Sequence, residues 1–417
     1  MGKIMLLGGS QCQWNAARQA KAMGHTVILA DYLAHPPAEA ICDAHERVST
    51  FDAQACIRAA KKHRVDGVFT AGSDQPVLTA ALVAEALSLP SPISAETAYR
   101  ATNKRGMKEA FARFGVPNAP HAFVRRGAAA EEIGDLAVPL VLKPLDSQGQ
   151  RGVFKVKSAY EAIARLPETL SFSRADEALV ESFYPSDELT LSAFVLDGRL
   201  FPLALTDRQR IDDPLHIGIC AAHRYPSVHR RLAREIITTA EAVALALGVT
   251  QGPLYIQFLI GDRGVIVNEA SARIGGAFED VFIPWLTGFD LLQAVIRLAM
   301  GEKVAPETLS LRGRTGEGVQ VSVQLPFCRP GAIASVTPIE EILALPGVLA
   351  AGYNMGAGGV VPALQNATAR FGHCVLATET GDMEDRLRLY YETLRVLDGG
   401  GNNLVIPRTF NGMEARR

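Results

Sequence analysis

The sequence predicts a multidomain protein of the α/β and α+β classes, with a doubly wound βαβ domain at the N-terminus and a small α+β domain at the C-terminus. Three observations lead there. Apolar runs of strand length alternate with helical segments early in the chain, glycine turns join β-branched runs in its middle, and the chain has 417 residues. At roughly 150 residues per domain, about three domains are expected. We place them at residues 1–98, 99–303 and 304–417.

The first domain is predicted from two successive repeats of strand and helix. Residues 3–7 are an apolar run, a helical pattern follows, and a second apolar run covers residues 26–30. The pattern repeats as a helix at 53–62, a strand at 65–70 and a helix at 74–87. Because a right-handed crossover joins parallel strands in such units, a parallel sheet with helices on both faces is expected.

The second domain is predicted to begin with a helix over residues 99–114, which the turn at Gly115 ends. Strands at 140–143 and 153–156 follow, joined by the loop 146–152, whose sequence is DSQGQRG. This arrangement predicts a hairpin.

Further elements complete the second domain and predict the third. They are strands between 178 and 201, a helix at 229–247, a hairpin at 254–269 and a helix at 291–300. After a polar linker at 301–318, the last hundred residues predict strands at 319–325 and 373–378 and helices at 340–344 and 383–397.

The composition excludes several classes of protein. With 42 basic and 44 acidic residues the formal charge is −2, which gives no electrostatic footprint for nucleic acid or for an anionic membrane. No apolar run approaches the roughly 18 residues that a membrane span needs, and we expect no signal peptide. The 6 cysteines are widely spaced without a CxxC pair. They predict reduced thiols and a cytoplasmic location.

Two glycine loops are candidates for phosphate binding. The first, LLGGSQCQWNAA, lacks the G-x-G-x-x-G spacing, and Asp31 is the only acid where a ribose-binding residue would stand. A tight turn, or a substrate-binding edge of the sheet, is the preferred interpretation. The second loop, 146–152, follows Lys143 at a strand end, and Lys104 lies on the helix before it. Two lysines from different elements would clamp a polyphosphate, whereas either lysine alone would be read as a solvated charge.

Later in the sequence, three acidic residues and one arginine suggest nucleotide and metal chemistry. Glu181 ends one apolar run and Glu188 opens the next. Glu269 ends another strand, with Arg273 four residues later. A carboxylate at a strand end beside phosphate-binding groups suits Mg²⁺, a hard cation that prefers oxygen ligands. A plain ion pair between Glu269 and Arg273 is the alternative.

The order of these residues along the chain resembles the ATP-grasp superfamily over about residues 1–300. NKRGMKEAFARFGVPNAP is similar to the helix with the family's first phosphate-binding lysine, here Lys104. LVLKPLDSQGQRGV is similar to the second lysine, Lys143, and the loop that closes over the triphosphate. The resemblance implies an ATP-grasp fold in which loop residues Ser147, Gly149 and Gly152 approach the phosphates.

The same resemblance implies roles for the acids. ALVESFYPSDELTLS is similar to the hinge that receives adenine, so Glu181 and the backbone at Phe183 would bind the purine and Glu188 the ribose. IVNEASARIGG is similar to the metal strand, with Glu269 on Mg²⁺ and Arg273 over the transferred phosphoryl group. Gly9, Ser10, Ser73 and Asp74 of the first domain would face the cleft.

Two positions depart from the family pattern. Gln257 stands where a second acidic metal ligand is usual, and Ser271 where an asparagine often follows. A glutamine carbonyl can coordinate Mg²⁺, but it removes one negative charge from the site. Either the chemistry runs with an altered metal site of Glu269, Gln257 and Ser271, or the domain binds nucleotide and turns over poorly.

The resemblance implies an ATP-dependent carboxylate–amine ligase that forms a peptide-like amide through an acyl phosphate and releases ADP and phosphate. The C-terminal third is similar to that of L-amino-acid ligases, and no biotin-carrier sequence of the Met-Lys-Met type is present. The alternatives are an ATP-dependent carboxylase or purine-pathway ligase of the same superfamily, and, from another class, a catalytically weak nucleotide-binding regulator. Expected partners are ATP, Mg²⁺, a small carboxylate and an amine, with neither nucleic acid nor membrane, in a possible homodimer.

One polar segment, residues 206–226, suggests substrate recognition. Its basic residues would bind a carboxylate or an amine, unless the segment is an exposed connection. A zinc site is not favoured, since no further pair of ligands completes a tetrahedron. The residues are Arg208, Arg210, His216, His223 and Arg224.

Overall fold

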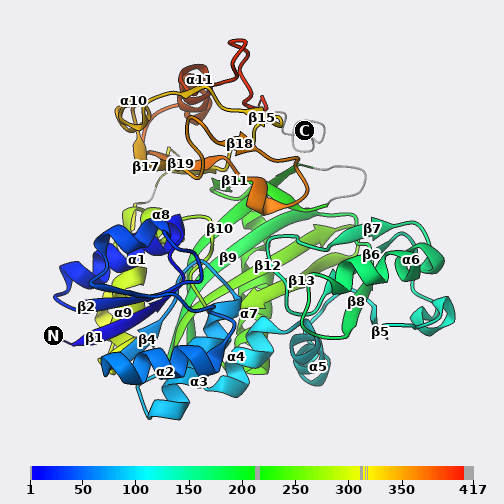
Figure 1. Ribbon diagram of the computed structural model, residues 1–417. Coiled ribbons are helices and arrows are strands. Elements are labelled where there is room, and N and C mark those ends of the chain that lie inside the picture. Colours follow the sequence, from blue (N-terminus) through cyan, green and yellow to red (C-terminus); the bar gives the residue numbers. More distant parts are fainter. Residues whose placement is uncertain (1, 212–216, 310–312, 315, 317, 408–417) are drawn as a thin grey trace.

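A computed structural model describes residues 2–211, 217–309, 313–314, 316 and 318–407. Its N-terminal part is a parallel four-stranded sheet in the order β3-β2-β1-β4, with α1 on one face and α2 and α3 on the other (Figure 1). In β1, Ile4 and Leu6 pack with α1, whereas Met5 and Leu7 pack with α2 and α3. The doubly wound prediction is therefore confirmed. The bounds are β1 (Lys3–Leu7), α1 (Gln11–Ala22), β2 (Thr26–Ala30), η1 (Pro37–Ile41), β3 (Ala44–Glu46), α2 (Ala53–His63), β4 (Gly67–Phe69) and α3 (Gln75–Leu87).

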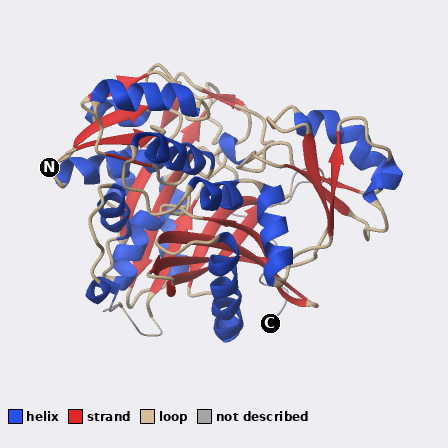
Figure 2. Cartoon of the chain, turned by 90° about the horizontal axis from the view of Figure 1, so that it is seen from below, coloured by secondary structure: helices blue, strands red, loops and turns tan. Residues whose placement is uncertain are grey.

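A second, antiparallel sheet in the order β5-β8-β6-β7 carries the predicted glycine loop. The loop joins β6 to β7, which pair as the expected hairpin. With α6 this sheet forms a lobe at the right of both views (Figures 1 and 2). The bounds here are α4 (Ala95–Thr102), α5 (Lys104–Phe114), β5 (His121–Arg125), η2 (Ala130–Ile133), β6 (Leu140–Pro144), β7 (Phe154–Val156), α6 (Ala159–Leu170) and β8 (Glu177–Ser182).

The largest sheet has eight strands in the order β13-β12-β9-β10-β11-β14-β19-β17. The predicted hairpin at 254–269 is β12 and β13, and β12 also pairs with β9. α8 and α9 are packed in the main core with strands of this sheet. The bounds are β9 (Asp187–Leu196), β10 (Arg199–Ile211), β11 (Ile219–Tyr225), η3 (Arg230–Leu232), α7 (Ala233–Leu247), β12 (Gly252–Gly261), β13 (Gly264–Ser271), α8 (Glu279–Thr287), α9 (Leu291–Ala299) and η4 (Pro306–Leu309).

The C-terminal part continues this large sheet instead of building a separate one. β14 pairs with β11, and β19 and β17 follow at the sheet edge. A local core nevertheless forms around Leu387 and Tyr390 of α11 and Phe371. The bounds are β14 (Gln320–Gln324), β15 (Gly331–Ala332), β16 (Ser335–Val336), α10 (Ile339–Leu343), β17 (Val348–Tyr353), β18 (Val360–Val361), η5 (Ala367–Ala369), β19 (Gly372–Thr378), α11 (Met383–Thr393) and β20 (Val396–Leu397).

Three helix predictions were wrong in their bounds, and one of them is the helix expected at 229–247, which begins at Ala233 after η3. The helix expected at 99–114 is two helices, because Asn103 leaves the helical conformation and its side chain accepts hydrogen bonds from the first amides of α5. The helix expected at 383–397 ends at Thr393, because Val396 is needed in β20, where it pairs with Val336 of β16. The expected linker at 301–318 contains η4, and 310–312, 315 and 317 lie outside the described residues.

Among the described residues, no single helix is both long and apolar enough to cross a bilayer. The helices α8 and α9 pass that test only as a pair, and the chain bends by 113° between them.

Candidate active site

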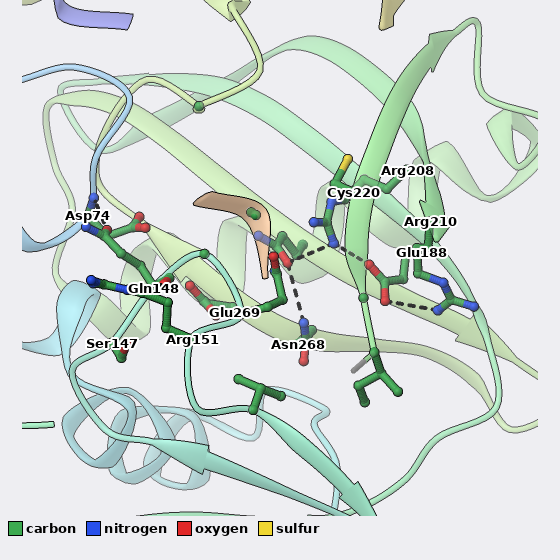
Figure 3. Close-up of a pocket in the computed structure, with 18 of the residues that line it drawn as sticks. Asp74, Ser147, Gln148, Arg151, Glu188, Arg208, Arg210, Cys220, Asn268 and Glu269 are labelled. Carbon is green, nitrogen blue, oxygen red and sulfur yellow. Dashed lines mark hydrogen bonds and ion pairs between the residues drawn. The ribbon is translucent and has the colours of Figure 1, made fainter. Parts of the chain in front are cut away.

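A cavity of about 1060 Å³ lies where the N-terminal sheet, the glycine-loop lobe and the large sheet meet. Its lining includes all four side chains on which the nucleotide prediction depends, which are Lys104, Lys143, Glu269 and Arg273. In Figure 3, Glu269 lies between the loop residues Gln148 and Arg151 and the cluster of Glu188 with Arg208 and Arg210. The structure therefore brings these distant segments together, while the role of each residue remains a prediction.

Lys104 is the first residue of α5, and the helix start fixes it against the glycine loop. Its amide donates to the Leu145 carbonyl at 3.0 Å and its Nζ donates to the Ser147 carbonyl, also at 3.0 Å. The Ser147 hydroxyl is buried and has no hydrogen-bond partner among the described residues. Lys104 and Ser147 thus lie together at the cavity, as expected of groups that hold a phosphate.

The two glycines of the loop have different positions. Gly149 lines the cavity with a φ of +68°, a left-handed conformation that favours glycine. Gly152 is not among the lining residues: a Cβ there would lie 2.8 Å from the Phe172 ring, so this glycine permits close packing below the loop. The predicted phosphate contact of Gly152 has no support in this geometry.

Lys143 belongs to a buried cluster of three charged side chains. The carboxylate of Glu181 binds Lys143 at 2.5 Å and Lys108 at 2.6 Å, one lysine on each oxygen. Lys108 is only 2% exposed, and it also donates to the Asn118 side chain at 3.1 Å. A buried carboxylate held by two lysines positions Lys143 firmly at the cavity wall. The first structural role of Glu181 is therefore to hold lysines, and its predicted bond to adenine stays a prediction.

The charged groups in this cluster shift one another's pKa values. Burial by itself would raise the pKa of Glu181, but the two ammonium groups outweigh it and lower this pKa to about 2. Burial lowers the pKa of Lys108 despite the attraction of Glu181. For Lys143, burial is outweighed by Glu181 and the more distant Glu269 and Glu188, so its pKa is raised. Lys143 thus remains a cation at neutral pH.

The predicted hinge residues lie beside this cluster. The Phe183 side chain lines the cavity with Lys155 3.7 Å above its ring centre. The Phe183 amide donates to the Pro139 carbonyl at 2.8 Å, so this amide is already engaged. Glu188, the predicted ribose partner, accepts from Arg208 and, at 3.0 Å, from Arg210 (Figure 3). Its carboxylate is therefore shared between two guanidinium groups.

The three predicted metal ligands share the hairpin of β12 and β13. Gln257 stands directly opposite Glu269 in the antiparallel register, and Ser271 lies two residues beyond Glu269 on the same face. Glu269 lines the cavity, and its carboxylate has no hydrogen bond or ion pair within the described part of the chain. The Ser271 hydroxyl is likewise buried without a partner there.

These oxygens fit a hard cation better than a soft one. Gln257 offers an amide oxygen that already accepts from Arg208 at 3.3 Å. No group of three or more His, Cys, Asp or Glu side chains suited to a metal occurs among the described residues. A cation at this site would therefore depend on Glu269, on neutral oxygens and on the oxygens of a bound phosphate.

Arg273 is buried at the cavity wall, where a hydrogen bond to Asp74 at the start of α3 holds it. Its Nε donates to Asp74 at 2.6 Å, and its guanidinium lies 4.6 Å from the ring centre of Tyr255. Burial would lower the pKa of Arg273, but the attraction of Asp74 raises it. The alternative of an ion pair with Glu269 is wrong, because Asp74 is the partner.

The edge of the N-terminal sheet contributes to the cavity as expected for Ser10, Ser73 and Asp74. Gly9 does not line it, and its amide donates to Asp31 at 2.8 Å. The other carboxylate oxygen of Asp31 accepts from the Leu33 amide at 2.8 Å. Asp31 therefore fixes a tight turn, which is the preferred interpretation of the first glycine loop.

Within the segment 206–226, residues 206–211 belong to β10 and residues 219–225 form β11, both strands of the large sheet. Arg208 and His223 are 8% and 3% exposed, so the alternative of an exposed connection is wrong for them. Both line the cavity, as does Arg210, whereas Arg224 pairs with Glu384 at 2.7 Å and does not line it. Burial lowers the pKa of His223 to about 4, so its imidazole is neutral. His216 lies outside the described residues.

Among the cavity and cluster residues that sequence reasoning missed are Lys108, Arg370 and His373. Lys108 carried a signal, since it lies among apolar residues on the buried face of α5. Arg370 and His373 line the cavity from the C-terminal part, and His373 stacks on Phe278 at 3.6 Å between ring centres. Nothing in the local pattern places these last two at the site, because the pairing of β14 and β19 with the large sheet brings them there.

Comparison with known proteins shows related sequences and folds. The family model described as L-amino acid ligase C-terminal domain 2 matches residues 323–396. The chain is 31% identical to a formate-dependent phosphoribosylglycinamide formyltransferase of Anaeromyxobacter dehalogenans, over 79% of this chain and 87% of the relative. It is 25% identical to an L-arginine-specific L-amino acid ligase of Bacillus subtilis, over 73% and 74% of the two chains.

Solved structures have the same fold. The crystal structure of an L-amino acid ligase from Bacillus licheniformis superposes with a TM-score of 0.78 at 18% identity, covering 95% of this chain and 99% of the other. A phosphoribosylglycinamide synthetase from Anaerococcus prevotii gives a TM-score of 0.73 at 18% identity, with coverage of 95% and 99%. The fold of a βαβ sheet and two antiparallel sheets is thus shared across nearly the whole chain.

Proposed function

Because this chain belongs to the ATP-grasp superfamily of ligases, we propose that it joins a carboxylate to an amine at the expense of ATP. The observation that carries the proposal is one cavity lined by Lys104, Lys143, Glu269 and Arg273. The family model at residues 323–396 and the L-amino acid ligases among the relatives support an amino acid as one substrate. The product would be a peptide or a peptide-like amide.

The proposed chemistry activates the carboxylate, because oxide is too poor a leaving group for direct amide formation. A carboxylate oxygen attacks the γ-phosphorus of ATP, the bond from that phosphorus to the β-phosphate oxygen breaks, and ADP leaves. The lone pair of the amine then attacks the acyl carbon, and the bond from that carbon to the phosphate oxygen breaks. Of the two protons that the ammonium form of the amine loses, one stays on the released hydrogen phosphate and one goes to water.

The residues of this chain would act by position and charge. Lys104 and Lys143 would bind phosphate oxygens, and Arg273 would neutralise the charge that gathers on the transferred phosphoryl group. The loop from Ser147 to Arg151 would cover the phosphates and exclude water, which would otherwise hydrolyse the acyl phosphate. Phe183 and Glu188 line the same cavity and would face the nucleoside.

A divalent cation fits the remaining oxygens. Glu269 would be its anionic ligand, with the neutral oxygens of Gln257 and Ser271 beside it. Mg²⁺ bound there would supply charge neutralisation for the phosphates. The partnerless Glu269 carboxylate, which lines the cavity, supports this site, whereas Ser271 is not among the lining residues and its part in the set rests on its buried, partnerless hydroxyl alone.

Gln257 is the specific observation in favour of a second candidate, a nucleotide-binding regulator with little turnover. The loss of one carboxylate weakens the metal site. Two features favour the ligase, namely the unpaired Glu269 and the firmly positioned Lys143. A carboxylase or a purine-pathway ligase remains the alternative within the superfamily.

The decisive assay is ADP release with amino acids supplied in pairs, with and without Mg²⁺. We expect release that requires two substrates and the metal. Dependence on bicarbonate would indicate the carboxylase instead, and nucleotide binding without turnover the regulator. The variants Lys143→Ala and Arg273→Ala should each reduce turnover by about 10²- to 10³-fold while the circular dichroism spectrum is unchanged. Wild-type rates in both variants would contradict the assignment.

We also propose that the enzyme works in the cytoplasm as a homodimer. The 6 cysteines are all free, which agrees with a reducing compartment. Sedimentation equilibrium tests the dimer, and a monomeric mass would exclude it.

A further inference from the structure

Arg370 is a guanidinium group at the cavity that the proposed phosphate chemistry does not use. It follows η5 in the C-terminal part and lines the same cavity as Arg273. The backbone holds it in place: its amide donates to the Ala367 carbonyl at 3.3 Å, and its carbonyl accepts from the Asn354 side chain at 2.9 Å. Arg370 thus presents its side chain from a fixed point.

The side chain of Arg370 has no partner. Its Nε is buried without an acceptor, and no ion pair or hydrogen bond of its guanidinium is found among the described residues. The other cavity arginines differ, because Arg208 is bound by Glu188 and Arg273 by Asp74. A guanidinium nitrogen buried without an acceptor is costly, and a bound anion would remove that cost.

The neighbours of Arg370 connect it to the segment that follows Arg273, because His373, three residues after Arg370, stacks on Phe278 at the cavity wall. Burial raises the pKa of Cys12 to about 12, and Arg370 and Arg273 both oppose this shift. Burial lowers the pKa of His373 to about 3, and Arg370 lowers it further. Arg370 therefore lies near the neutral His373 ring. Its positive charge also acts to lower the pKa of Cys12, as does the charge of Arg273, the arginine proposed for phosphoryl transfer.

An uncharged wall stands beside this guanidinium. His373 stacks on Phe278 with their planes only 15° apart, and both line the cavity. Phe278 has a φ of +59°, a conformation uncommon for a bulky residue, so the surrounding structure holds the ring at this wall. A ligand here would meet one positive charge and one flat, neutral surface.

We propose that Arg370 binds the free carboxylate of the acceptor, and that the acceptor is an α-amino acid whose uncharged side chain packs against Phe278 and His373. This deepens the proposed ligase function and rests on it. Carboxylate and guanidinium match as a bidentate pair. The acceptor amine, two bonds from the carboxylate carbon, would then face the acyl phosphate near Arg273. The product would be an amide that keeps one free carboxylate.

The test separates acid activation from acceptor binding. Hydroxylamine replaces the acceptor in the first arm, because it traps an acyl phosphate as a hydroxamate and carries no carboxylate. In the second arm the acceptor is an apolar amino acid or its α-carboxamide, which has lost the carboxylate. The proteins are wild type, Arg370→Gln, Arg370→Lys and, as a matched control on the exposed face of α11, Arg388→Gln.

We expect Arg370→Gln to raise the KM for the amino acid acceptor by roughly 10- to 100-fold, the usual range for a lost charged hydrogen bond. Hydroxamate formation and the KM for the carboxamide should stay as in wild type. Arg370→Lys should recover part of the affinity, and Arg388→Gln should behave as wild type.

Three outcomes would contradict the proposals, and they tell a failure of the ligase function apart from a failure of the role of Arg370. If wild type forms no hydroxamate with any amino acid, the ligase function itself fails, and this inference with it. If wild type forms hydroxamate but Arg370→Gln still prefers the amino acid to its carboxamide, only the inference fails. If Arg370→Gln loses hydroxamate formation, Arg370 serves the acid or the nucleotide, and acceptor binding is excluded.

Discussion

At the scale of single residues, the site depends on which charges have partners. Glu181 and Arg273 are satisfied by neighbouring side chains and are thereby fixed in position. Glu269 and Arg370 have no such partner within the described residues, and we assign them to ligands. Burial of an unpaired charge is unfavourable in the free protein and becomes favourable when the ligand arrives. Pairing thus holds Arg273 in place at the cavity, whereas Glu269 and Arg370 would gain a partner only from a ligand.

The cluster of Glu181 with its two lysines makes a prediction about stability and pH. The pKa of Glu181 is lowered from its ordinary value of 4.5 to about 2, so its contribution to stability is present above pH 4.5 and is lost as pH falls toward 2. Lys108→Met removes one of the two ammonium groups and raises this pKa. We expect the variant to be less stable than wild type by about 1–3 kcal/mol at neutral pH.

The difference should narrow at about pH 3, because wild type then loses more stability than the variant does. Urea unfolding at both pH values measures this. Lys104→Met is the control: its ammonium donates to the Ser147 carbonyl, not to a carboxylate, so its effect should not change with pH in this way. A gap between wild type and Lys108→Met that is the same at both pH values would contradict the assignment.

At the scale of elements, the hairpins were predictable, whereas the bounds of several helices were not. The glycine turns at 146–152 and 261–264 separate β-branched runs, and both hairpins formed as expected. The end of a helix can depend on pairing between segments that are far apart in the sequence. The helical pattern of α11 continues past Thr393, yet Val396 is required in β20. The break at Asn103 carried a visible signal, since asparagine is a favoured N-cap residue.

The glycine loop makes the prediction that belongs to this scale. The Gln148 side chain accepts from the Asp74 amide at 2.7 Å and from the Gln75 amide at 3.3 Å, at the start of α3. On the other side, Gly149 accepts from the Ala367 amide at 3.1 Å. The loop is therefore held between the N-terminal and C-terminal parts.

Gln148→Ala removes two of these bonds, so we expect the loop to open more often. Limited proteolysis within residues 146–152 should become about 5- to 150-fold faster, since each of the two hydrogen bonds contributes about 0.5–1.5 kcal/mol. Gln148→Glu is the matched control, because a carboxylate accepts from the same amides and suits a helix N-terminus. Equal cleavage rates in wild type and Gln148→Ala would exclude this restraint.

At the scale of the whole molecule, the composition of the cavity was only partly predictable. The ordered motifs from Lys104 to Arg273 predicted the residues that meet at the cavity, because each lies at a strand or helix end with a local signal. Arg370 and His373 reach the cavity only through the pairing of β14 and β19 with the large sheet. Such pairing depends on packing between segments far apart in sequence, and single-sequence patterns do not report it.

This shared sheet leads to the last prediction, that the C-terminal part is required for the rest to fold. Val321 and Val323 of β14 and Val375 of β19 belong to the same buried cluster as Ile4 and Leu6 of β1. Deleting residues 319–417 would expose that face of the cluster and leave β11 as an unpaired edge. Fully burying one such side chain contributes about 1.5–3 kcal/mol, so the loss of several exceeds the usual stability of a domain.

We expect the chain of residues 1–318 to aggregate or to lack a cooperative thermal transition, whereas the full chain should unfold with its parts coupled. Scanning calorimetry and analytical gel filtration measure this difference. A monomeric, cooperatively unfolding 1–318 chain would show that the N-terminal and central parts are independent of the strands that complete their sheet.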